Sequence, residues 1–566
     1  MPHRQTPAWH LFVPKLITVL REGYSLGHLR ADVIAGLTVA IVALPLAMAL
    51  AIASGATPDK GLITSVIAGF LISALGGSRF QIGGPTGAFV VVVFNVIARH
   101  GYDGLVLATL MAGLLLTAAG LLRLGTFVKY IPEPVVTGFT TGIAIIIFSS
   151  QIKDLFGLHM AQVPAEFIAK WEAFWAARDT FSIASAGIAF AALALIVVLR
   201  RTAPKMPAFL IAVVAASLAA WAFALPVDTI GSRFGGIPHS LPMPQMPAIG
   251  MARLVELLPS ALTIAFLAGV ESLLSAVVAD GMTGRRHRSN CELVAQGIAN
   301  IGSALFGGLP ATGAIARTAT NIRTGARSPI AGMLHAGFVL AFMMFLAPLA
   351  NFIPLASLAA VLVIVAWNMS EIDKLRHLLH APLEERLILL VTLGLTVLVD
   401  LTLAIEIGVV MAAMAFMHRM SQSVAVTLGV SAIEEEIDDF AEPLPPHDQR
   451  LALPDGVEVF QLRGPLFFGA ASRLGEVLDR AGPIPPVFIL RMREVPLIDA
   501  TGVGALESFV SRCTARGTRI IVSGIQDQPL TILTHMGLAA RLIFADNFES
   551  AKALAVPDGP LPLGAA

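Results

Sequence analysis

The chain has 566 residues, of which 56% are hydrophobic and 13% charged, and its 38 basic and 38 acidic residues cancel. Soluble domains carry roughly 25% charged residues, so this composition excludes a mainly soluble protein and indicates one solvated largely by lipid. The balanced charge argues against a nucleic-acid binder. The two cysteines, Cys291 and Cys513, lie in different regions without metal-ligand spacing, so neither a zinc site nor a disulfide framework is indicated.

The N-terminal segment, residues 1–30, carries charges through a mildly apolar stretch and has no small-residue cleavage site. It is therefore not predicted to be a signal peptide. We interpret it as a cytoplasmic amphipathic segment that leads into the first membrane span.

Apolar windows recur between residues 31 and 420. A bilayer core about 30 Å thick needs roughly 20 apolar residues per helix. On this basis the sequence predicts an all-α polytopic domain of about fourteen transmembrane helices. The approximate spans are 31–53, 60–77, 84–98, 103–123, 130–149, 181–199, 207–225, 256–280, 291–306, 312–323, 328–349, 353–367, 386–400 and 402–418.

The loops between these spans alternate between rich and poor in lysine and arginine, as the positive-inside rule requires. If the N-terminus is inside, the even-numbered loops hold clusters such as Arg200, Arg201 and Lys205, or Arg285, Arg286 and Arg288. An even number of spans then returns the C-terminus to the same side. The prediction is a multi-pass protein of the cell membrane with both termini in the cytoplasm.

Beyond the membrane spans, residues 421–450 are acidic and proline-bearing without an apolar window, which is typical of a linker. A soluble domain is predicted over residues 451–566. Strands are predicted at 457–462, 487–491 and 519–523, and helices near 470–480, 502–516 and 528–536. This alternation indicates a small α/β domain that buries its own core.

Two short segments inside the membrane domain look alike: GGPTGAF at Gly83–Phe89 and GGLPATGAIA at Gly307–Ala316. Each opens a short span, and matched Gly/Pro-interrupted spans predict inverted repeats with discontinuous helices around a midplane site. In the predicted topology the N-termini of the two half-helices face each other. Unpaired N–H groups and about half a positive charge at each end would bind an anion. The alternative is that both segments are re-entrant kinks whose glycines only allow close packing.

These segments, together with Ala43–Leu62, Glu271–Leu293 and Gly307–Gly332, resemble the SulP family of anion transporters, which includes sulfate permeases and bicarbonate transporters. The C-terminal domain resembles a STAS domain. The resemblance covers nearly the whole chain and implies two inverted seven-helix repeats divided into a core and a gate domain. It also implies a homodimer and an elevator-like motion of the core.

The resemblance places the anion between the N-terminal ends of the third and tenth spans. The substrate-binding residues carried over in this way are Thr86, Gly87, Ala88, Ala314, Ile315 and Ala316. Leu46 and Leu50 of the first span would close one side. Family members often have glutamine and an aromatic residue in that part of the first span, so the two leucines leave selectivity open.

Glu271 is predicted to couple transport to protons, because an ionisable group within a span costs several kcal/mol unless it is paired, hydrated or neutralised. Sodium-coupled relatives use an aspartate with a nearby hydroxyl. Here Glu271 has Ser275 one turn on and the apolar Ile315 where such a relative has threonine, which favours protons. The alternative is that Glu271 only forms an ion pair with Arg317. Arg317 is itself predicted to add positive potential to the anion site.

In the soluble domain, PLIDATGVGAL at Pro496–Leu506 resembles the strand-to-helix turn of STAS domains. Asp499 and Thr501 match the pattern that carries a phosphorylated residue in anti-sigma-factor antagonists, and they are candidate regulatory residues. The alternative is that Thr501 is simply a helix N-cap. Partner docking or dimer stability are further uses of this domain.

No Walker lysine motif, zinc-protease motif or serine-nucleophile elbow is present in the sequence, so no enzymatic activity and no cofactor is predicted. The sequence predicts secondary active transport of inorganic anions such as sulfate, coupled to protons, within membrane lipid. Alternatives are transport of bicarbonate or small dicarboxylates, a passive anion channel, and an anion sensor.

Overall fold

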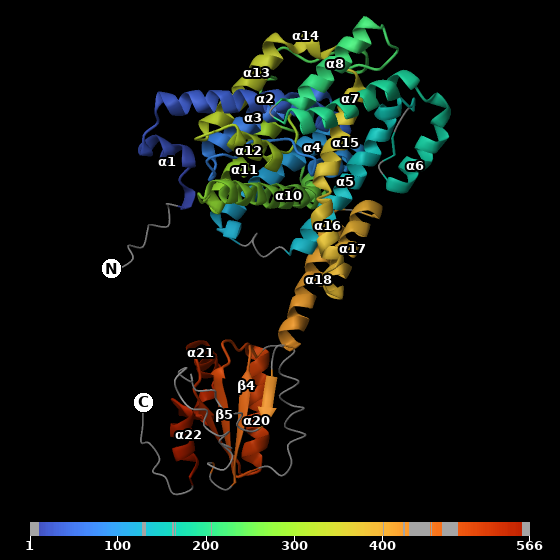
Figure 1. The fold of residues 1–566 in the computed structure, drawn as a ribbon. Coiled ribbons are helices and arrows are strands. Elements are labelled where there is room, and N and C mark those ends of the chain that lie inside the picture. Colours follow the sequence, from blue (N-terminus) through green and yellow to red (C-terminus); the bar gives the residue numbers. More distant parts are fainter. Residues whose placement is uncertain are drawn as a thin grey trace. The chain divides into compact units, whose positions relative to one another are not determined.

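The computed structural model describes residues 11–126, 132–160, 163–164, 166–204, 206–399, 401–422, 425–428, 453, 456–466 and 485–556. The chain divides into two compact units, Met1–Val410 and Met411–Ala566. The first is helical, and the second contains the larger sheet (Figure 1). Each unit is described by itself.

The first half of the membrane unit is built from helices that follow one another with short connections. They are α1 (Lys15–Glu22), α2 (Leu26–Ala53), α3 (Pro58–Leu75), α4 (Phe89–Leu121), α5 (Glu133–Phe156), α6 (Phe167–Ala176), α7 (Ile183–Thr202) and α8 (Ala208–Ala222). The strand β1 (Gly83–Gly84) precedes α4. A residue in a left-handed conformation, Gly101 with φ 72°, breaks α4 into two helices.

The second half of the membrane unit contains a corresponding set of helices. They are α10 (Met251–Thr283), α11 (Ser289–Leu305), α12 (Ile315–Arg323), α13 (Ile330–Phe345), α15 (Leu355–Met369), α17 (Leu383–Leu398) and α18 (Leu401–Gln422). The strand β2 (Thr312–Gly313) precedes α12. Shorter helices between them are α9 (Ile230–Phe234), α14 (Ala347–Ala350) and α16 (Ile372–Leu379).

Each of the fourteen predicted spans overlaps one of these helices, and the break at Gly101 separates the third span from the fourth. The first span begins earlier than predicted, at Leu26, because Ser25 and His28 form a reciprocal capping box ahead of it. Among the described residues, eight helices are long and apolar enough to cross a membrane, and α8 and α13 are shorter apolar helices. The predicted polytopic α-helical fold is confirmed.

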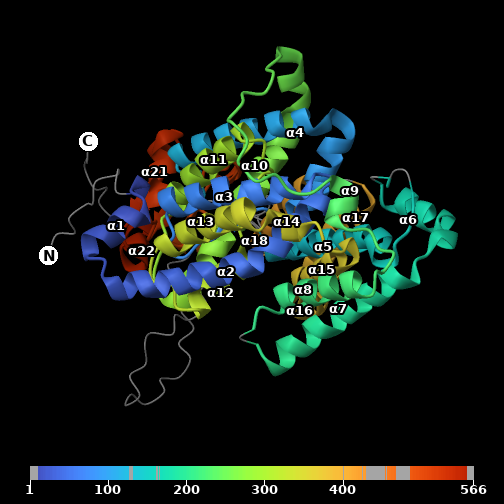
Figure 2. The same ribbon diagram turned by 90° about the horizontal axis from the view of Figure 1, so that it is seen from above.

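The helices of the membrane unit form two packed groups. One group, the core, contains α2, α3, α4 and α10 to α13, and the other, the gate, contains α5, α7, α8, α15 and α17. Seen from above, the core and the gate lie side by side (Figure 2). At the crossing of α4 and α11, Gly113 and Gly297 face each other, and a Cβ on Gly113 would lie 2.7 Å from the Gly297 carbonyl oxygen. Glycine there allows the close helix packing found in membranes.

The pattern of contacts repeats between the two halves of the unit. Helix α13 packs against α2 and α3 in the same way that α4 packs against α10 and α11. In the gate, α17 contacts α5 as α7 contacts α15. The partners in each comparison occupy equivalent places in the two seven-helix repeats.

The second unit contains a five-stranded sheet in the order β3-β4-β5-β6-β7, parallel except for the β3–β4 pair. Its elements are β3 (Ala425–Leu428), β4 (Val457–Arg463), β5 (Val487–Glu494), α20 (Ala500–Ala515), β6 (Arg519–Ser523), α21 (Asp527–His535), β7 (Ile543–Ala545) and α22 (Phe548–Ala555). Apolar residues from both faces of the sheet are buried in two clusters, one beneath α20 and α21 and the other beneath α22.

The soluble α/β domain agrees with the sequence prediction, and its three predicted strands appear as β4, β5 and β6. The sheet also includes β3, which comes from the predicted linker, and β7, which the sequence analysis did not identify. The helix predicted near 470–480 lies outside the described residues.

Candidate functional site

The two matched Gly/Pro segments meet at the centre of the core group. Strand β1 pairs antiparallel with β2, with Gly83 opposite Gly313 and Gly84 opposite Thr312. The Ala314 N–H donates to the Ile82 carbonyl oxygen at 2.8 Å and extends the pairing by one bond. Segments far apart in the chain are thus held together directly before the two half-helices.

The half-helices α4 and α12 begin after Ala88 and Ala314, and neither start has a side-chain cap. At α4 the Phe89 and Val90 N–H groups donate to the Thr86 and Gly87 carbonyl oxygens, at 3.3 and 3.1 Å, but in the part of the chain that the structure describes several neighbouring N–H groups at the two starts have no acceptor. The residues whose N–H groups remain free are Gly87, Ala88, Ile315, Ala316 and Arg317. Such N–H groups bind an anion when one is present.

The predicted site residues differ in their exposure. Ala88 is fully buried and Ala314 nearly so, whereas Ile315 is 38% exposed. Ala316 is exposed and Thr86 is half-buried. On the other side, Leu50 belongs to the same apolar cluster as Ala88, with the half-buried Leu46 packed against it.

Gly87 lies where the core contacts the gate. A Cβ at this residue would lie 2.5 Å from the Met369 sulfur at the end of α15 and 3.2 Å from Ile147 of α5. The start of the first half-helix therefore packs against two gate helices.

Glu271 reaches the first half-helix from α10. The Thr86 hydroxyl donates to the Glu271 Oε2 atom at 2.7 Å, and both side chains are half-buried. Among the described residues, no ion pair within 4.0 Å joins Glu271 to Arg317. Ser275 donates instead to the Thr318 hydroxyl at 3.2 Å, so it is not a partner of Glu271.

Arg317 lies in the first turn of α12, with its guanidinium beside Gly84 of β1, and is 2% exposed. Its Nη2 atom donates to the Pro85 carbonyl oxygen, while Nε and Nη1 have no partner in the described part of the chain. Gly84 has φ 148°, and a Cβ there would lie 2.6 Å from Nη1. The guanidinium therefore occupies space that only glycine leaves open, close to the first half-helix.

Buried hydroxyl and amide groups hold the β1–β2 pair in place. The Ser272 and Thr312 hydroxyls are 2.6 Å apart, and the Gly313 N–H donates to Ser272 at 3.1 Å. The Gln81 amide donates to the Ser272 carbonyl oxygen at 3.2 Å. The Ile82 N–H donates to Thr318 at 3.1 Å. The sequence analysis missed these four side chains, although each is a polar residue within or beside a predicted apolar span.

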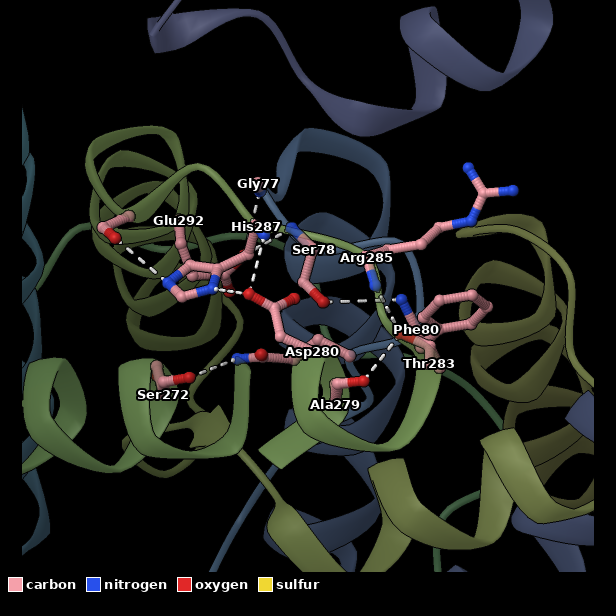
Figure 3. A network of polar contacts seen from close by, with 12 residues as sticks. Gly77, Ser78, Phe80, Ser272, Ala279, Asp280, Thr283, Arg285, His287 and Glu292 are labelled. Atoms are coloured by element: carbon pink, nitrogen blue, oxygen red, sulfur yellow. Dashed lines mark hydrogen bonds and ion pairs between the residues drawn. The ribbon is translucent and has the colours of Figure 1, made fainter. Parts of the chain in front are cut away.

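A second polar network lies beside the turn before β1 (Figure 3). Glu292 of α11 is fully buried and accepts hydrogen bonds from the N–H groups of Gly77 and Ser78, at 2.9 and 3.1 Å. The His287 ring lies 2.7 Å from the Asp280 carboxylate at the end of α10. These contacts anchor the segment that leads to the site, and the sequence analysis did not identify Glu292.

In the soluble unit, the predicted regulatory residues lie at the start of α20. The Asp499 carboxylate accepts the Gly502 N–H at 2.8 Å and is the N-cap, whereas Thr501 is exposed in the first turn. The suggestion that Thr501 caps the helix is therefore wrong, because Asp499 already occupies that position. No cluster of three or more histidine, cysteine, aspartate or glutamate residues suited to a metal occurs among the described residues.

Two family models match the chain: "Sulfate permease family" over residues 29–392 and "STAS domain" over residues 450–551. The chain is 40% identical to "Putative sulfate transporter YvdB" of Bacillus subtilis, over 91% of this chain and 95% of that protein. It is 32% identical to "Bicarbonate transporter BicA" of Synechocystis, over 95% of both chains.

Two solved structures resemble the fold. The transmembrane domain of a cyanobacterial bicarbonate transporter BicA matches with a TM-score of 0.62 and 33% identity, covering 67% of this chain and 98% of that one. Murine Solute Carrier 26 family member A9 in the inward-facing state matches with a TM-score of 0.84 and 17% identity, covering 97% and 95%. At this identity the second likeness concerns the fold alone.

Proposed function

The chain belongs to the sulfate permease family, and from this membership and the geometry of its site we propose that it carries small inorganic anions such as sulfate across the membrane. The observation that carries the proposal is the pair of uncapped half-helices whose starts are joined by β1 and β2. Gly87, Ala88, Ile315 and Ala316 supply free N–H groups there.

Arg317 supports an anion as the occupant. Its two unpartnered nitrogens lie in a buried setting where a positive charge is costly without compensation. A bound anion offsets that cost, and the positive ends of both half-helices act in the same direction. The site therefore combines helix ends from two repeats with one buried cation.

Glu271 gives the site its proposed coupling to protons. When ionised, it accepts the Thr86 hydrogen bond and places a negative charge beside the first half-helix. Like charges oppose each other, so an anion binds more readily once this carboxyl is protonated. By thermodynamic linkage the anion and the proton then favour each other's binding, which is the requirement for symport.

The separation into core and gate supports alternating access by an elevator-like motion. Glu271, Arg317 and both half-helices belong to the core, whereas Met369 and Ile147 over Gly87 belong to the gate. Movement of the core past these two gate residues would expose the site to either side. We place both termini in the cytoplasm on the loop charges, and propose a homodimer in the membrane with the STAS domain as a docking or regulatory module.

The proposal is tested with the purified full chain in proteoliposomes at zero membrane potential. Labelled sulfate uptake is measured with and without an acidic outer solution. One proton per anion allows roughly tenfold accumulation per pH unit, and a passive channel or a sensor would not concentrate sulfate.

Replacement of Glu271 by glutamine keeps a hydrogen-bonding group but removes the titration. We expect Glu271→Gln to carry sulfate with no response to the pH gradient. The matched control is Glu256→Gln on the same helix, because Glu256 is 59% exposed and pairs with His100. A full pH response in Glu271→Gln would refute the coupling.

Bicarbonate is the second candidate substrate, because the chain aligns over 95% of its length with a bicarbonate transporter at 32% identity. Backbone N–H groups suit both oxyanions. Unlabelled bicarbonate and small dicarboxylates added to the same uptake assay separate these substrates, since the preferred anion displaces labelled sulfate at the lowest concentration.

A further inference from the structure

Helix α6 has an unusual distribution of side chains. Its buried residues are Lys170, at 3% exposure, and Phe174, at 4%, one helical turn apart. Its exposed face carries Ile168, Trp171 and Trp175, at 63, 41 and 71%. A helix at a membrane interface is expected to bury apolar residues and leave lysine in water. Here the lysine points inward and the tryptophans outward.

Among the described residues, the Lys170 ammonium has one interaction. It lies 5.4 Å from the centre of the Phe94 ring. In the described part of the chain, no hydrogen bond from its side chain and no carboxylate within 4.0 Å is found. Burial lowers the pKa of Lys170 below its ordinary value, since no negative group counteracts the loss of water. The contact between a cation and an aromatic ring stabilises the charge less than a full ion pair would.

The location of this lysine relates it to the anion site. Phe94 belongs to the half-helix that begins at Phe89, directly after the free N–H groups of Gly87 and Ala88. Five residues along a helix correspond to about 7.5 Å. Helix α6 contacts the gate helices α5 and α17. Lys170 therefore links α6, which packs against the gate, to the core half-helix, a short distance from the proposed site.

A second lysine that faces an aromatic ring of α4, Lys60 of α3, provides a contrast. Lys60 lies 5.2 Å from the centre of the Tyr102 ring, which also belongs to α4. However, its ammonium is 3.8 Å from Asp59, and its side chain is 26% exposed. Lys60 thus has a counterion and is partly exposed, whereas Lys170 is buried and has no counterion among the described residues.

We propose that Lys170 forms a second binding site for the transported inorganic anion, which the anion occupies on its way between the α6 face of the protein and the two half-helices. This inference rests on the proposed function. In the proposed topology α6 lies between the fifth and sixth spans, on the extracellular side. The anion supplies the counterion that Lys170 lacks, and Phe94 orients the ammonium while the site is empty.

The experiment compares Lys170→Gln, Lys170→Arg and Lys60→Gln with the unaltered full chain in proteoliposomes of phosphatidylcholine. Labelled sulfate and labelled bicarbonate are both used, and the KM is measured separately from each side. We expect Lys170→Gln to raise the KM from the α6 side by roughly tenfold, corresponding to about 1.4 kcal/mol, with little change in maximal rate. Lys170→Arg restores the KM because it keeps the charge. Lys60→Gln leaves it unchanged.

The pH dependence of the KM from the α6 side provides a second test, because a purely structural role of Lys170 would not affect it. Because the pKa of Lys170 is lowered, the unaltered protein loses this charge as the pH rises, and its KM from the α6 side increases in alkaline solution. Lys170→Arg removes that increase, since a guanidinium stays charged. An unchanged KM in Lys170→Gln, or an equal change from both sides, overturns the inference while leaving the proposed function intact. If the unaltered chain carries neither anion, both proposals fall.

A lipid phosphate is the other source of a counterion. The same measurements in vesicles containing an anionic phospholipid distinguish the two. Competition between that lipid and the transported anion for Lys170 raises the KM of the unaltered protein but not that of Lys170→Gln. If instead anionic lipid is required for any effect of Lys170→Gln, Lys170 is a lipid site and the inference is wrong.

Discussion

The N-terminus of α20 in the soluble unit differs from the N-termini of the two half-helices in the membrane unit. At α20 the Asp499 side chain accepts the Gly502 N–H at 2.8 Å, so the chain satisfies its own helix end. At α4 and α12 the preceding residues are Ala88 and Ala314, which offer no side-chain acceptor. The side-chain cap stabilises the start of α20, whereas the N–H groups at the uncapped starts of α4 and α12 remain available to a ligand.

The missing caps at α4 and α12 cost stability. A side-chain cap typically stabilises a helix by about 1 kcal/mol, and neither α4 nor α12 has one. The buried Arg317, at the start of α12, adds a second energetic cost, because two of its nitrogens have no hydrogen-bond partner among the described residues. In the proposed function, a bound anion would compensate both the free N–H groups of the two helix starts and the charge of Arg317.

The largest expected effect comes from giving the membrane site its own cap. Ala314 has extended backbone angles, φ −94° and ψ 110°, which suit an N-cap residue. In Ala314→Asp the new carboxylate would accept the free N–H groups of α12 and occupy the place of the anion. We expect sulfate uptake to fall at least about 100-fold, while the thermal unfolding temperature does not decrease.

Ala314→Gly is the matched control, since it leaves the helix end open. It should retain most of the uptake activity. Uptake by Ala314→Asp close to that of the unaltered protein would show that the anion does not bind at this helix end.

A smaller loss is expected from removing the buried cation. Arg317→Gln keeps a donor for the Pro85 carbonyl oxygen but removes the charge behind the half-helices. We expect the KM for sulfate to rise roughly tenfold or more, because a charged hydrogen-bonding group is worth about 1.5–3 kcal/mol. Arg317→Lys restores part of the affinity. An unchanged KM in Arg317→Gln would mean that the helix ends alone bind the anion.

Much of this arrangement is predictable from the sequence, because long apolar windows and the repeated Thr-Gly-Ala motif are local patterns. They predict the spans, the two facing half-helices and the soluble α/β domain. Hydropathy does not reveal which helices form the core and which form the gate, since that division depends on contacts between residues distant in the chain. The strand β3 was not predicted, because it lies in an acidic segment that resembles a linker.

The details of the site were less predictable for a physical reason. A carboxylate and an arginine in neighbouring spans suggest an ion pair, yet Glu271 is bonded to Thr86 and Arg317 to the Pro85 carbonyl oxygen. Backbone carbonyl oxygens are exposed wherever a helix is interrupted, and the sequence does not show which side chain will reach them. The same holds for Glu292, whose partners are the backbone N–H groups of Gly77 and Ser78.

The smallest expected effect lies at the capped helix of the soluble unit. Asp499→Ala removes the acceptor for the Gly502 N–H, so the free energy of unfolding of this unit should fall by about 1 kcal/mol. Urea-dependent proteolysis of the soluble unit within the full chain measures this, with Asp499→Asn as the control that retains a cap. Sulfate uptake should not change, because Asp499 satisfies this helix end within the soluble unit itself. Loss of uptake in Asp499→Ala with the unit still folded would contradict the comparison, since the capped end would then take part in transport through regulation by the soluble domain.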